Sequence, residues 1–283
     1  MEKNAVLFVN IQKENAVNKA EQIKKELEKR GIKITVFSFE GKPQIPPKGK
    51  WDIAFSLGGD GTVLFTARCL APLSVPILPI HLGSLGFLAE VAGDDWLDVF
   101  EKWERGEIFA SHRCMLEISV QRESKIVTKN ICLNDAVISA SGIAKLINLD
   151  VNMNSKTGAD SENIVLGSYR CDGLIVSTPT GSTAYSMAAG GPILDPEMEA
   201  MLLTPICPFS LSNRPLVLPS KQTLVITVAE VQRSGVLLTV DGQDIYDLKG
   251  KDKVFVKQAD TFAQLIYTDR HNYYSALRTK LGG

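Results

Sequence analysis

The sequence predicts an α/β N-terminal domain with a parallel sheet, followed by an all-β, sandwich-like C-terminal domain. Strand-like apolar runs alternate with helical patterns up to residue 111, which is typical of a parallel sheet covered by helices. From residue 112 onward the pattern changes to short segments of period two. We therefore predict domains at residues 1–111 and 112–267, and a helical tail, 268–283, that returns to the first domain.

The first domain is expected to begin with a buried strand and a helix. Residues 5–9 are apolar, and apolar side chains then recur at helical spacing from Ala16 to Leu27 until Gly31 ends the helix. The prolines and glycines of residues 42–50 indicate a loop. The other elements predicted here are strands at 32–39, 53–57 and 77–80 and helices at 63–70 and 94–103.

The second domain is predicted from alternation alone. Its segments of period two are short, which indicates an all-β, sandwich-like domain. A final helical segment, 272–281, follows the last strand. The predicted strands are 115–121, 125–131, 136–140, 146–151, 173–177, 224–228, 236–240, 254–256 and 262–267.

Composition limits the possible partners. The 283 residues carry 31 basic and 32 acidic side chains, so no excess positive charge favours nucleic acid or an anionic membrane. The N-terminus lacks the regions of a signal peptide, and we expect a cytoplasmic protein.

The five cysteines are widely spaced and odd in number, which favours reduced thiols. His112 and Cys114 have no second pair that would complete a zinc site.

A glycine-rich turn is the first candidate site. The predicted strand 53–57 runs into Gly-Gly-Asp-Gly-Thr at residues 58–62, and a helix follows at once. Such a turn exposes backbone N–H groups to a phosphate. A carboxylate at Asp60 would repel phosphate unless it binds a metal ion or accepts a proton, which favours phosphoryl transfer. Alternatively, Asp60 is only a turn or capping residue. Neither a Walker A sequence nor a dinucleotide-binding glycine fingerprint occurs.

Three further segments carry polar or aromatic side chains suited to a nucleotide. Hydroxyls are dense at residues 178–186, where they could bind ribose or phosphate or simply cap the next short helix. The pair Asn134-Asp135 could hold the hydroxyls of a sugar or form an ordinary turn. Phe87 could stack on a base or belong to the core.

In their order along the chain, these segments resemble the NAD kinase family. The resemblance covers the turn at 58–62, the Gly-x-Leu-Gly-Phe-Leu segment ending at Leu88, Asn134-Asp135, residues 172–192, 214–218 and 240–243, and more weakly 274–282. Diacylglycerol kinases, sphingosine kinases and phosphofructokinases have a similar glycine turn. The hydroxyl-rich residues 178–186 distinguish this chain from those families.

The resemblance implies transfer of the terminal phosphoryl group of ATP, or of another donor, to the adenosine 2′-hydroxyl of NAD, with a divalent metal ion such as Mg²⁺ whose ligands are not assigned. It implies Asp60 as the catalytic residue, and a homodimer or homotetramer in which Asp172 and Arg170 reach a neighbouring chain's dinucleotide. The implied NAD-binding residues are Asp60, Gly61, Phe87, Asn134, Asp135, Lys145, Arg170, Asp172, Thr183, Ala184, Tyr185, Ser186, Met187, Ala188 and Gln243. The implied donor-binding residues are Gly58, Gly59, Gly61, Thr62 and Arg68.

The chain departs from the family pattern at four places. Many members have Glu at position 135, a basic or imidazole side chain near Phe65, His at position 209 and Ser at position 188, where this chain has Asp, Phe, Phe and Ala. None of these departures involves Asp60. Two other functions remain alternatives: a lipid kinase that uses the same glycine turn, and a non-catalytic protein that binds a dinucleotide.

Overall fold

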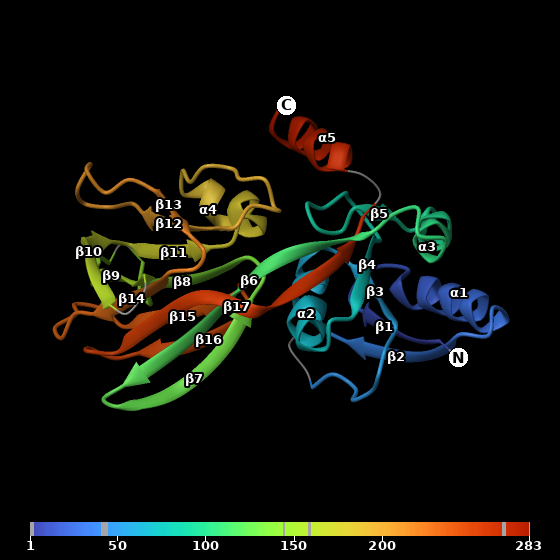
Figure 1. Ribbon diagram of the computed structural model, residues 1–283, viewed down its shortest axis with the longest axis horizontal. Coiled ribbons are helices and arrows are strands. Elements are labelled where there is room, and N and C mark those ends of the chain that lie inside the picture. The colour runs from blue at the N-terminus through green and yellow to red at the C-terminus, as the bar shows by residue number, and fades with distance from the viewer. Residues whose placement is uncertain (1–2, 41–44, 144, 158–159, 268–269, 283) are drawn as a thin grey trace. The chain divides into compact units, whose positions relative to one another are not determined.

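The computed structural model describes residues 3–40, 45–143, 145–157, 160–267 and 270–282. The chain forms two compact units (Figure 1), of which unit 1 comprises Met1–Arg113 and Thr261–Gly283 and unit 2 comprises Cys114–Asp260. The sequence analysis placed these divisions at residues 111 and 267. Residues 42–44 of the predicted loop and 268–269 of the predicted tail lie outside the described residues.

Unit 1 is built on a parallel sheet, as the alternation of strands and helices predicts. Each central strand is buried on both faces, which explains its unbroken apolar sequence. The far end of β17 extends the sheet by pairing in parallel with β4, and the short strand β5 (Val91–Ala92) also pairs with β4. The sheet order is β2 (Lys33–Phe39), β1 (Asn4–Asn10), β3 (Ile53–Gly58) and β4 (Pro76–His81).

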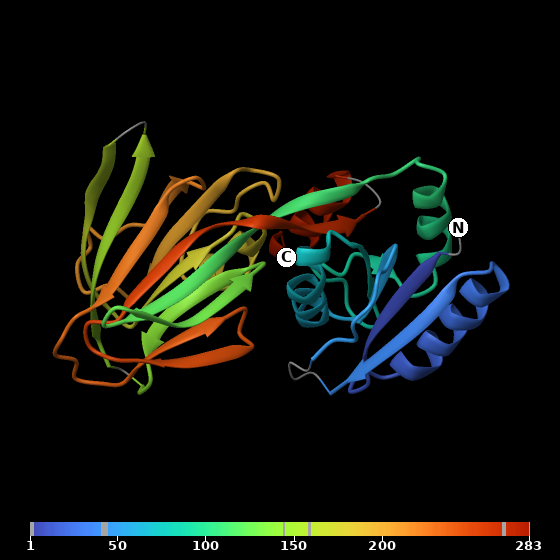
Figure 2. The same cartoon turned by 60° about the horizontal axis from the view of Figure 1, so that its bottom comes forward.

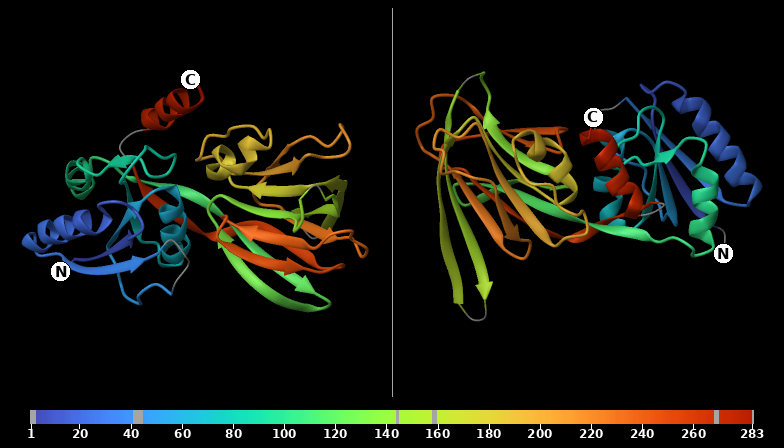
Figure 3. Two further views of the ribbon diagram at one scale, coloured as in Figure 1. Left: turned by 180° about the vertical axis from the view of Figure 1, so that it is seen from behind. Right: turned by 90° about the horizontal axis from the view of Figure 1, so that it is seen from above.

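Helices cover both faces of this sheet (Figures 2 and 3). The apolar residues of α1 (Ala16–Lys29) and α3 (Trp96–Glu104) share one core with β1, β3 and β4. On the opposite face, Phe65 of α2 (Asp60–Leu70) packs against Phe8, with ring centroids 6.0 Å apart. A 3-10 turn, Ala71–Leu73, follows α2. None of the described helices is long and apolar enough to cross a membrane.

Unit 2 contains two antiparallel sheets, and the predicted β-rich region is confirmed. The first sheet has the order β13 (Leu216–Pro219), β12 (Ala200–Ile206), β11 (Gly173–Ser177), β8 (Asp135–Ala140), β15 (Val236–Val240) and β16 (Asp244–Leu248). The second contains β10 (Asp160–Cys171), β9 (Ile147–Thr157), β14 (Thr223–Val228) and the first part of β17 (Lys253–Ile266), joined by β6 (Ala110–Arg122) and β7 (Lys125–Cys132).

The core of unit 2 lies between these two sheets. Ile138 and Val176 from the first sheet and Leu149 and Ile226 from the second belong to one buried cluster. Alternate residues of each strand point into this layer, which explains the period-two pattern of the sequence. A 3-10 turn, Thr180–Thr183, and the short helix α4 (Tyr185–Ala188) follow β11.

The structure differs from the predicted elements in three respects. Five strands were not predicted, namely β5, β10, β12, β13 and β16. Of these, β10 is largely polar and β12 is a continuous apolar run that lacks alternation. The predicted strands at 254–256 and 262–267 are parts of one strand, β17. Helix α2 begins at Asp60, three residues before the predicted start, because the glycine turn itself provides its first turn. The tail forms α5 (Arg270–Leu281), as predicted.

Candidate functional site

The carboxylate of Asp60 joins the turns that follow β3 and β4. Asp60 is the first residue of α2, directly after the N-cap residue Gly59. Its Oδ2 accepts a hydrogen bond from the N–H of Phe87 at 3.0 Å. Oδ1 accepts two more, from Leu88 at 3.1 Å and Ala89 at 2.9 Å. The structure therefore excludes a simple capping role and makes Asp60 the centre of a backbone cradle.

Two glycines make this close approach possible. A Cβ atom built on Gly86 would overlap Oδ1 of Asp60, so only glycine fits there. Similarly, a Cβ on Gly58 would overlap the hydroxyl of Thr62. The side chain of Thr62 is thus packed against the turn, and the residue is only 3% exposed. Gly61, by contrast, is exposed at the N-terminus of α2 and presents backbone to a ligand.

Two cationic side chains, Arg68 and Lys280, belong to the helices near this turn. Arg68 belongs to the last turn of α2 and starts about 12 Å along the helix axis from Asp60, at a rise of about 1.5 Å per residue. Lys280 of α5 contacts the cradle, because its Nζ lies 4.4 Å from the centroid of the Phe87 ring. The half-buried ring of Phe87 is therefore in contact with a cation and does not belong to the core.

A partly buried acid, Glu90, and a buried cation, Arg113, interact near the cradle. Glu90 follows directly after the residues that bind Asp60, and its Oε2 is buried without a hydrogen-bond partner. Burial raises the pKa of Glu90 to about 7, Arg113 lowers it and Asp60 raises it further. Arg113 is 3% exposed, and its guanidinium carbon lies 5.3 Å from the centroid of the Tyr267 ring. Glu90 is therefore close enough to both Arg113 and Asp60 for their charges to act on its pKa.

In unit 2, Asp241 shapes the backbone around Asn134. Its carboxylate accepts hydrogen bonds from the N–H groups of Leu133 at 3.0 Å, Asn134 at 2.8 Å and Asp135 at 3.2 Å. Asp241 has a φ of 50° and Gly242 a φ of 65°, so both residues are in the left-handed region. This turn directs the Asp241 carboxylate toward the three N–H groups. The turn fixes the position of the Asn-Asp pair that the sequence singled out.

The hydroxyl-rich segment packs directly against the same pair. Thr178 donates its hydroxyl to the carbonyl of Leu133 at 2.6 Å, and its N–H to the carbonyl of Asn134 at 2.9 Å. Gly181 approaches so closely that a Cβ there would overlap the carbonyl oxygen of Asn134. Two motifs far apart in the sequence therefore form one rigid corner of unit 2.

A pocket of about 350 Å³ opens at this corner. Asn134 has a buried Oδ1 without a hydrogen-bond partner, which suits a donor such as a sugar hydroxyl. Burial, and secondarily the charge of Asp241, raise the pKa of Asp135 to about 7. Tyr185 is 47% exposed and offers its ring to a ligand. The residues lining the pocket are Asn134, Asp135, Val137, Ser139, Ala184, Tyr185, Thr239, Asp241 and Gly242.

The other residues implied in unit 2 lie outside this lining. Thr183 and Ser186 are buried, and their hydroxyls bond to the carbonyl of Thr180 and the hydroxyl of Thr204. Met187, Ala188, Asp172 and Gln243 do not line the pocket, while Lys145 and Arg170 line a different one. These assignments stay predictions.

Two of the departures from the family pattern have a structural explanation. Phe65 is 4% exposed and belongs to an aromatic cluster with Phe8, Phe37 and Phe39, where a basic side chain would be buried without a partner. Phe209 is 71% exposed, and its ring centroid lies 4.8 Å from the guanidinium carbon of Arg170. Nothing in the structure explains alanine at position 188.

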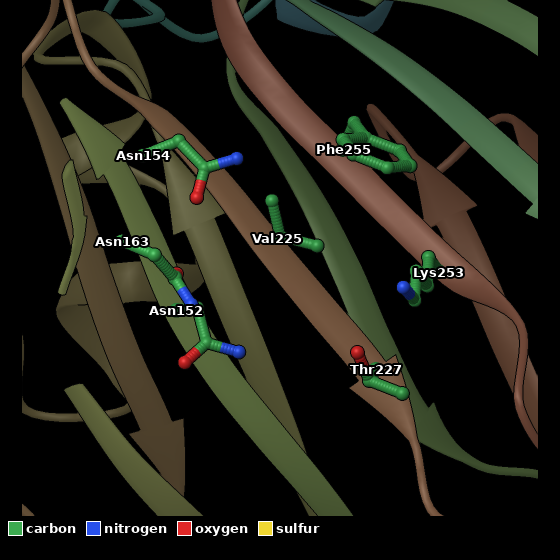
Figure 4. Close-up of a pocket in the computed structure, with 7 residues that line it drawn as sticks. All are labelled: Asn152, Asn154, Asn163, Val225, Thr227, Lys253 and Phe255. Carbon is green, nitrogen blue, oxygen red and sulfur yellow. The ribbon is translucent and has the colours of Figure 1, made fainter. Parts of the chain in front are cut away.

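A further hollow lies on the outer face of the second sheet (Figure 4). It has a volume of about 330 Å³ and contains none of the predicted site residues. Asparagine side chains from β9 and β10 share it with Val225, Thr227, Lys253 and Phe255 from β14 and β17. This polar surface is separate from the pocket at Asn134.

Sequence reasoning missed the residues that position the site. Asp241 and Gly86 hold other residues in place, and only their neighbours had been given a role. Thr178 belonged to the hydroxyl-rich segment that was predicted to bind a ligand or cap a helix, and its contact with Leu133 was not foreseen. The Asp-Gly pair directly after β15 was a usable signal, since this dipeptide favours left-handed turns. No local signal indicated Arg113 or Glu90, because their surroundings are formed by distant segments.

A glycine turn with an anchored carboxylate in the α/β unit, and a pocket with an unpaired Asn134 amide oxygen in the β-sandwich, are features that suit a phosphotransferase with an alcohol acceptor. Comparison with known proteins identifies its family. The pattern of the ATP-NAD kinase N-terminal domain matches residues 46–108, and that of the ATP-NAD kinase C-terminal domain matches residues 133–268. The chain belongs to the NAD kinase family.

Individual relatives agree with this assignment. The chain is 42% identical to the NAD kinase of Treponema denticola over 281 residues, which is 99% of this chain and 96% of that protein. It is 40% identical to the NAD kinase of Geobacter sulfurreducens over 230 residues, 81% of this chain and 78% of that protein.

Solved structures share the fold. Yeast NADH kinase, crystallised with NADH, has a TM-score of 0.86 at 24% identity and covers 99% of this chain and 88% of its own. An NAD kinase from Archaeoglobus fulgidus in complex with ATP has a TM-score of 0.71 at 23% identity and covers 96% of both chains.

Proposed function

We propose that this chain phosphorylates the 2′-hydroxyl of the adenosine ribose of NAD with ATP, forming NADP, and that Asp60 accepts the proton of that hydroxyl. Family membership supports the reaction. The three hydrogen bonds to the Asp60 carboxylate support the role of this residue, because they hold it in one position beside a turn suited to phosphate.

The hydrogen bonds also favour one oxygen as the proton acceptor. A carboxylate has about two acceptor sites on each oxygen. Oδ1 of Asp60 already accepts two N–H groups, whereas Oδ2 accepts only the N–H of Phe87. Oδ2 therefore keeps one site for the ribose hydroxyl, which makes it the proposed proton acceptor.

The reaction needs one bond to form and one to break. The ribose 2′-oxygen attacks the γ-phosphorus, and the bond between that phosphorus and the oxygen bridging to the β-phosphate breaks, so ADP leaves. The hydroxyl proton moves to Oδ2 of Asp60 as the new bond forms. The exposed backbone at Gly61 and the N-terminal dipole of α2 attract the phosphates.

A divalent cation such as Mg²⁺ would neutralise the charge of the triphosphate. Mg²⁺ takes most of its ligands from substrate phosphates and water and needs only one or two protein carboxylates. The remaining acceptor site on Oδ2 of Asp60 is assigned to the ribose hydroxyl. The triphosphate and water would therefore supply the ligands of the metal ion.

The pocket at Asn134 supplies the recognition of the dinucleotide. We assign its buried Oδ1 and the carboxyl of Asp135 to sugar hydroxyls, and the ring of Tyr185 to stacking on a base. The proposal also includes a homodimer or homotetramer in which Asp172 and Arg170 contact a dinucleotide bound to a neighbouring chain.

The test is turnover by the purified protein. NAD, ATP and Mg²⁺ are supplied, and NADP is read by an NADP-specific dehydrogenase, with reactions containing chelator as the control. NADP should form only with the metal ion. Other triphosphates and polyphosphate in place of ATP define the donor. The proposal fails if NAD binds without turnover, as a non-catalytic binder would show, or if a lipid acceptor is labelled instead.

A further inference from the structure

A buried carboxyl oxygen without a partner lies directly after the Asp60 cradle. Glu90 is the next residue after Ala89, whose N–H binds Asp60 at 2.9 Å. Oε2 of Glu90 is buried, and no hydrogen bond from the described residues satisfies it. A buried carboxylate without a partner is costly, so this position favours the protonated, uncharged form of the side chain.

The backbone on both sides of Glu90 is fixed. The N–H of Gly86 donates to the carbonyl of Ala89 at 3.1 Å, which closes the turn before Glu90. Directly after Glu90, β5 pairs in parallel with β4. A charge on Glu90 therefore acts from a set position beside the N–H groups that hold the Asp60 carboxylate.

A buried cation accompanies this acid. Arg113 of β6 is 3% exposed, and its Nε is buried without a hydrogen-bond partner among the described residues. Its guanidinium contacts the ring of Tyr267, in the segment that follows β17. Arginine does not lose its proton in proteins. The positive charge of Arg113 is thus permanent, whereas Glu90 can gain or lose a proton.

The net charge near the cradle therefore depends on pH. Burial raises the pKa of Glu90 to about 7, the charge of Arg113 from β6 lowers it, and that of Asp60 from α2 raises it. A further cation, Lys280 of α5, lies at the ring of Phe87. At low pH, Asp60 is the negative charge that acts on Glu90. Above about pH 7, Glu90 itself adds a second negative charge.

We propose that Glu90 is a positioning residue of the cradle and takes up a proton when the phosphates of ATP bind at the glycine turn, with Arg113 as the permanent counter-charge. The proton comes from the solvent, and no covalent bond of ATP changes in this step. The bound triphosphate is negative and disfavours a second carboxylate nearby, so phosphate binding and protonation of Glu90 promote each other. The inference rests on the proposed function, which places the triphosphate at this turn.

The consequence is a pH dependence of ATP affinity with a definite sign. Glu90 is uncharged at low pH and does not repel the phosphates, so ATP binds most tightly there. As the pH rises through about 7, ionised Glu90 repels ATP, and the affinity falls until the pH passes the higher pKa of Glu90 in the ATP-bound protein. A rise of about one unit in that pKa corresponds to a fall of about 10-fold in affinity.

The experiment counts the protons that the full-length protein takes up with ATP. Isothermal titration calorimetry with ATP and Mg²⁺, without NAD, is carried out at pH 8 in two buffers of different ionisation enthalpy. Glu90→Gln keeps the size of the side chain but cannot ionise. The wild type should take up roughly 0.4 of a proton per site more than Glu90→Gln, as expected when a pKa rises from about 7 to about 8.

Two other variants complete the comparison. Glu21→Gln removes an exposed carboxylate of α1 and should take up as many protons as the wild type. Arg113→Gln removes the charge that lowers the pKa of Glu90, so the fall in ATP affinity should occur at higher pH. If Arg113→Gln does not fold, Glu90→Gln and Glu21→Gln still decide the result.

The pH profile of the KM for ATP is an independent measurement in the coupled assay. Between pH 6 and pH 9 this KM should rise about 10-fold more in the wild type and in Glu21→Gln than in Glu90→Gln. The comparison with Glu90→Gln cancels the ionisation of ATP itself. A purely structural role of Glu90 would change the KM by the same factor at every pH.

The proposal is overturned if the wild type and Glu90→Gln take up equal numbers of protons, if their ATP affinities depend on pH in the same way, or if the wild type binds no ATP. Wild-type protein that binds ATP with proton uptake but forms no NADP would refute only the proposed function. Formation of NADP with equal proton uptake in both proteins would refute only the role of Glu90.

Discussion

Asp60 and Gly86 lie so close together that a single methyl group at position 86 would overlap Oδ1 of the carboxylate. Replacement of Gly86 by Ala should therefore push the loop away and weaken the hydrogen bonds from residues 87–89. We expect a loss of roughly 10–100-fold in kcat, because small displacements of catalytic groups are costly. Gly83→Ala is the matched control, since a Cβ there meets no atom. Equal activity of the two variants in the coupled assay would show that the cradle does not matter.

Asp60→Asn should be folded and nearly inactive. The amide cannot take the ribose proton, and loss of proton acceptance should lower kcat by roughly 10²–10⁴-fold. The amide nitrogen would also face one of the backbone N–H donors, which should cost about 1–3 kcal/mol of unfolding free energy. NAD affinity should change much less. Calorimetric titration with NAD beside the coupled assay decides the point: near-normal turnover would refute the catalytic role, and parallel loss of binding would reduce Asp60 to a positioning residue.

Asp135 should make the protein's stability depend on pH. Burial raises the pKa of Asp135 in the folded protein to about 7, above the unfolded value near 3.8. The contribution of Asp135 to folding stability is therefore most favourable at low pH and is lost as the pH rises between these two values. Asp135→Asn removes that cost and should be stabilised relative to wild type by roughly 1–3 kcal/mol more at pH 8 than at pH 4. Urea denaturation at the two pH values measures the difference. A stability difference independent of pH would contradict the buried, protonatable state.

The ion pair between Arg122 and Asp252 should stabilise unit 2. Nη2 of Arg122 lies 2.7 Å from Oδ2 of Asp252, Nε lies 3.0 Å from Oδ1, and the aspartate side chain is only 1% exposed. Burial alone would raise the pKa of Asp252, but the hydrogen bonds from Arg122 and the N–H of Lys249 outweigh it and lower the pKa. The stabilisation is therefore present above the unfolded pKa near 3.8 and decreases as pH falls below it.

Arg122→Ala should consequently destabilise the protein by about 2–4 kcal/mol at pH 7, since it leaves a buried carboxylate without its partner. Lys221→Ala removes an exposed ion pair with Glu199, with N and O 3.9 Å apart, and should change stability by less than about 1 kcal/mol. Thermal or urea unfolding of both variants provides the comparison. Similar small effects would mean that the buried pair contributes no more than a surface pair.

Sharing of sites between chains can be tested with mixed oligomers. Asp60→Asn subunits are expected to lack the proton acceptor, and Asp172→Ala subunits to lack a contact to the neighbour's dinucleotide. Mixing the two inactive proteins should restore part of the activity, because some sites combine intact residues from both chains. Absence of recovery in oligomers shown to be mixed, or full activity of a monomer, would contradict shared sites.

Local sequence determined most of the secondary structure of this protein. The alternation of strands and helices up to residue 111 and the period-two segments after it reflect which face of each element is buried, and this information is local. The glycine turn before α2 and the residues Asn134 and Asp135 could be singled out for the same reason. Prediction failed for five strands, among them β10 and β12, whose residues do not alternate and whose pairing depends on other strands.

Only the tertiary structure decided how the candidate residues act. The N–H groups that hold Asp60 come from the turn after β4, and those that Asp241 binds come from the turn before β8. The charges that act on Glu90 come from α2 and β6. In each case the partners are far apart in the chain, so the spacing of residues along the sequence does not predict the contact. Packing of the strands brings them within hydrogen-bonding or electrostatic range, and that proximity gives each side chain its chemistry.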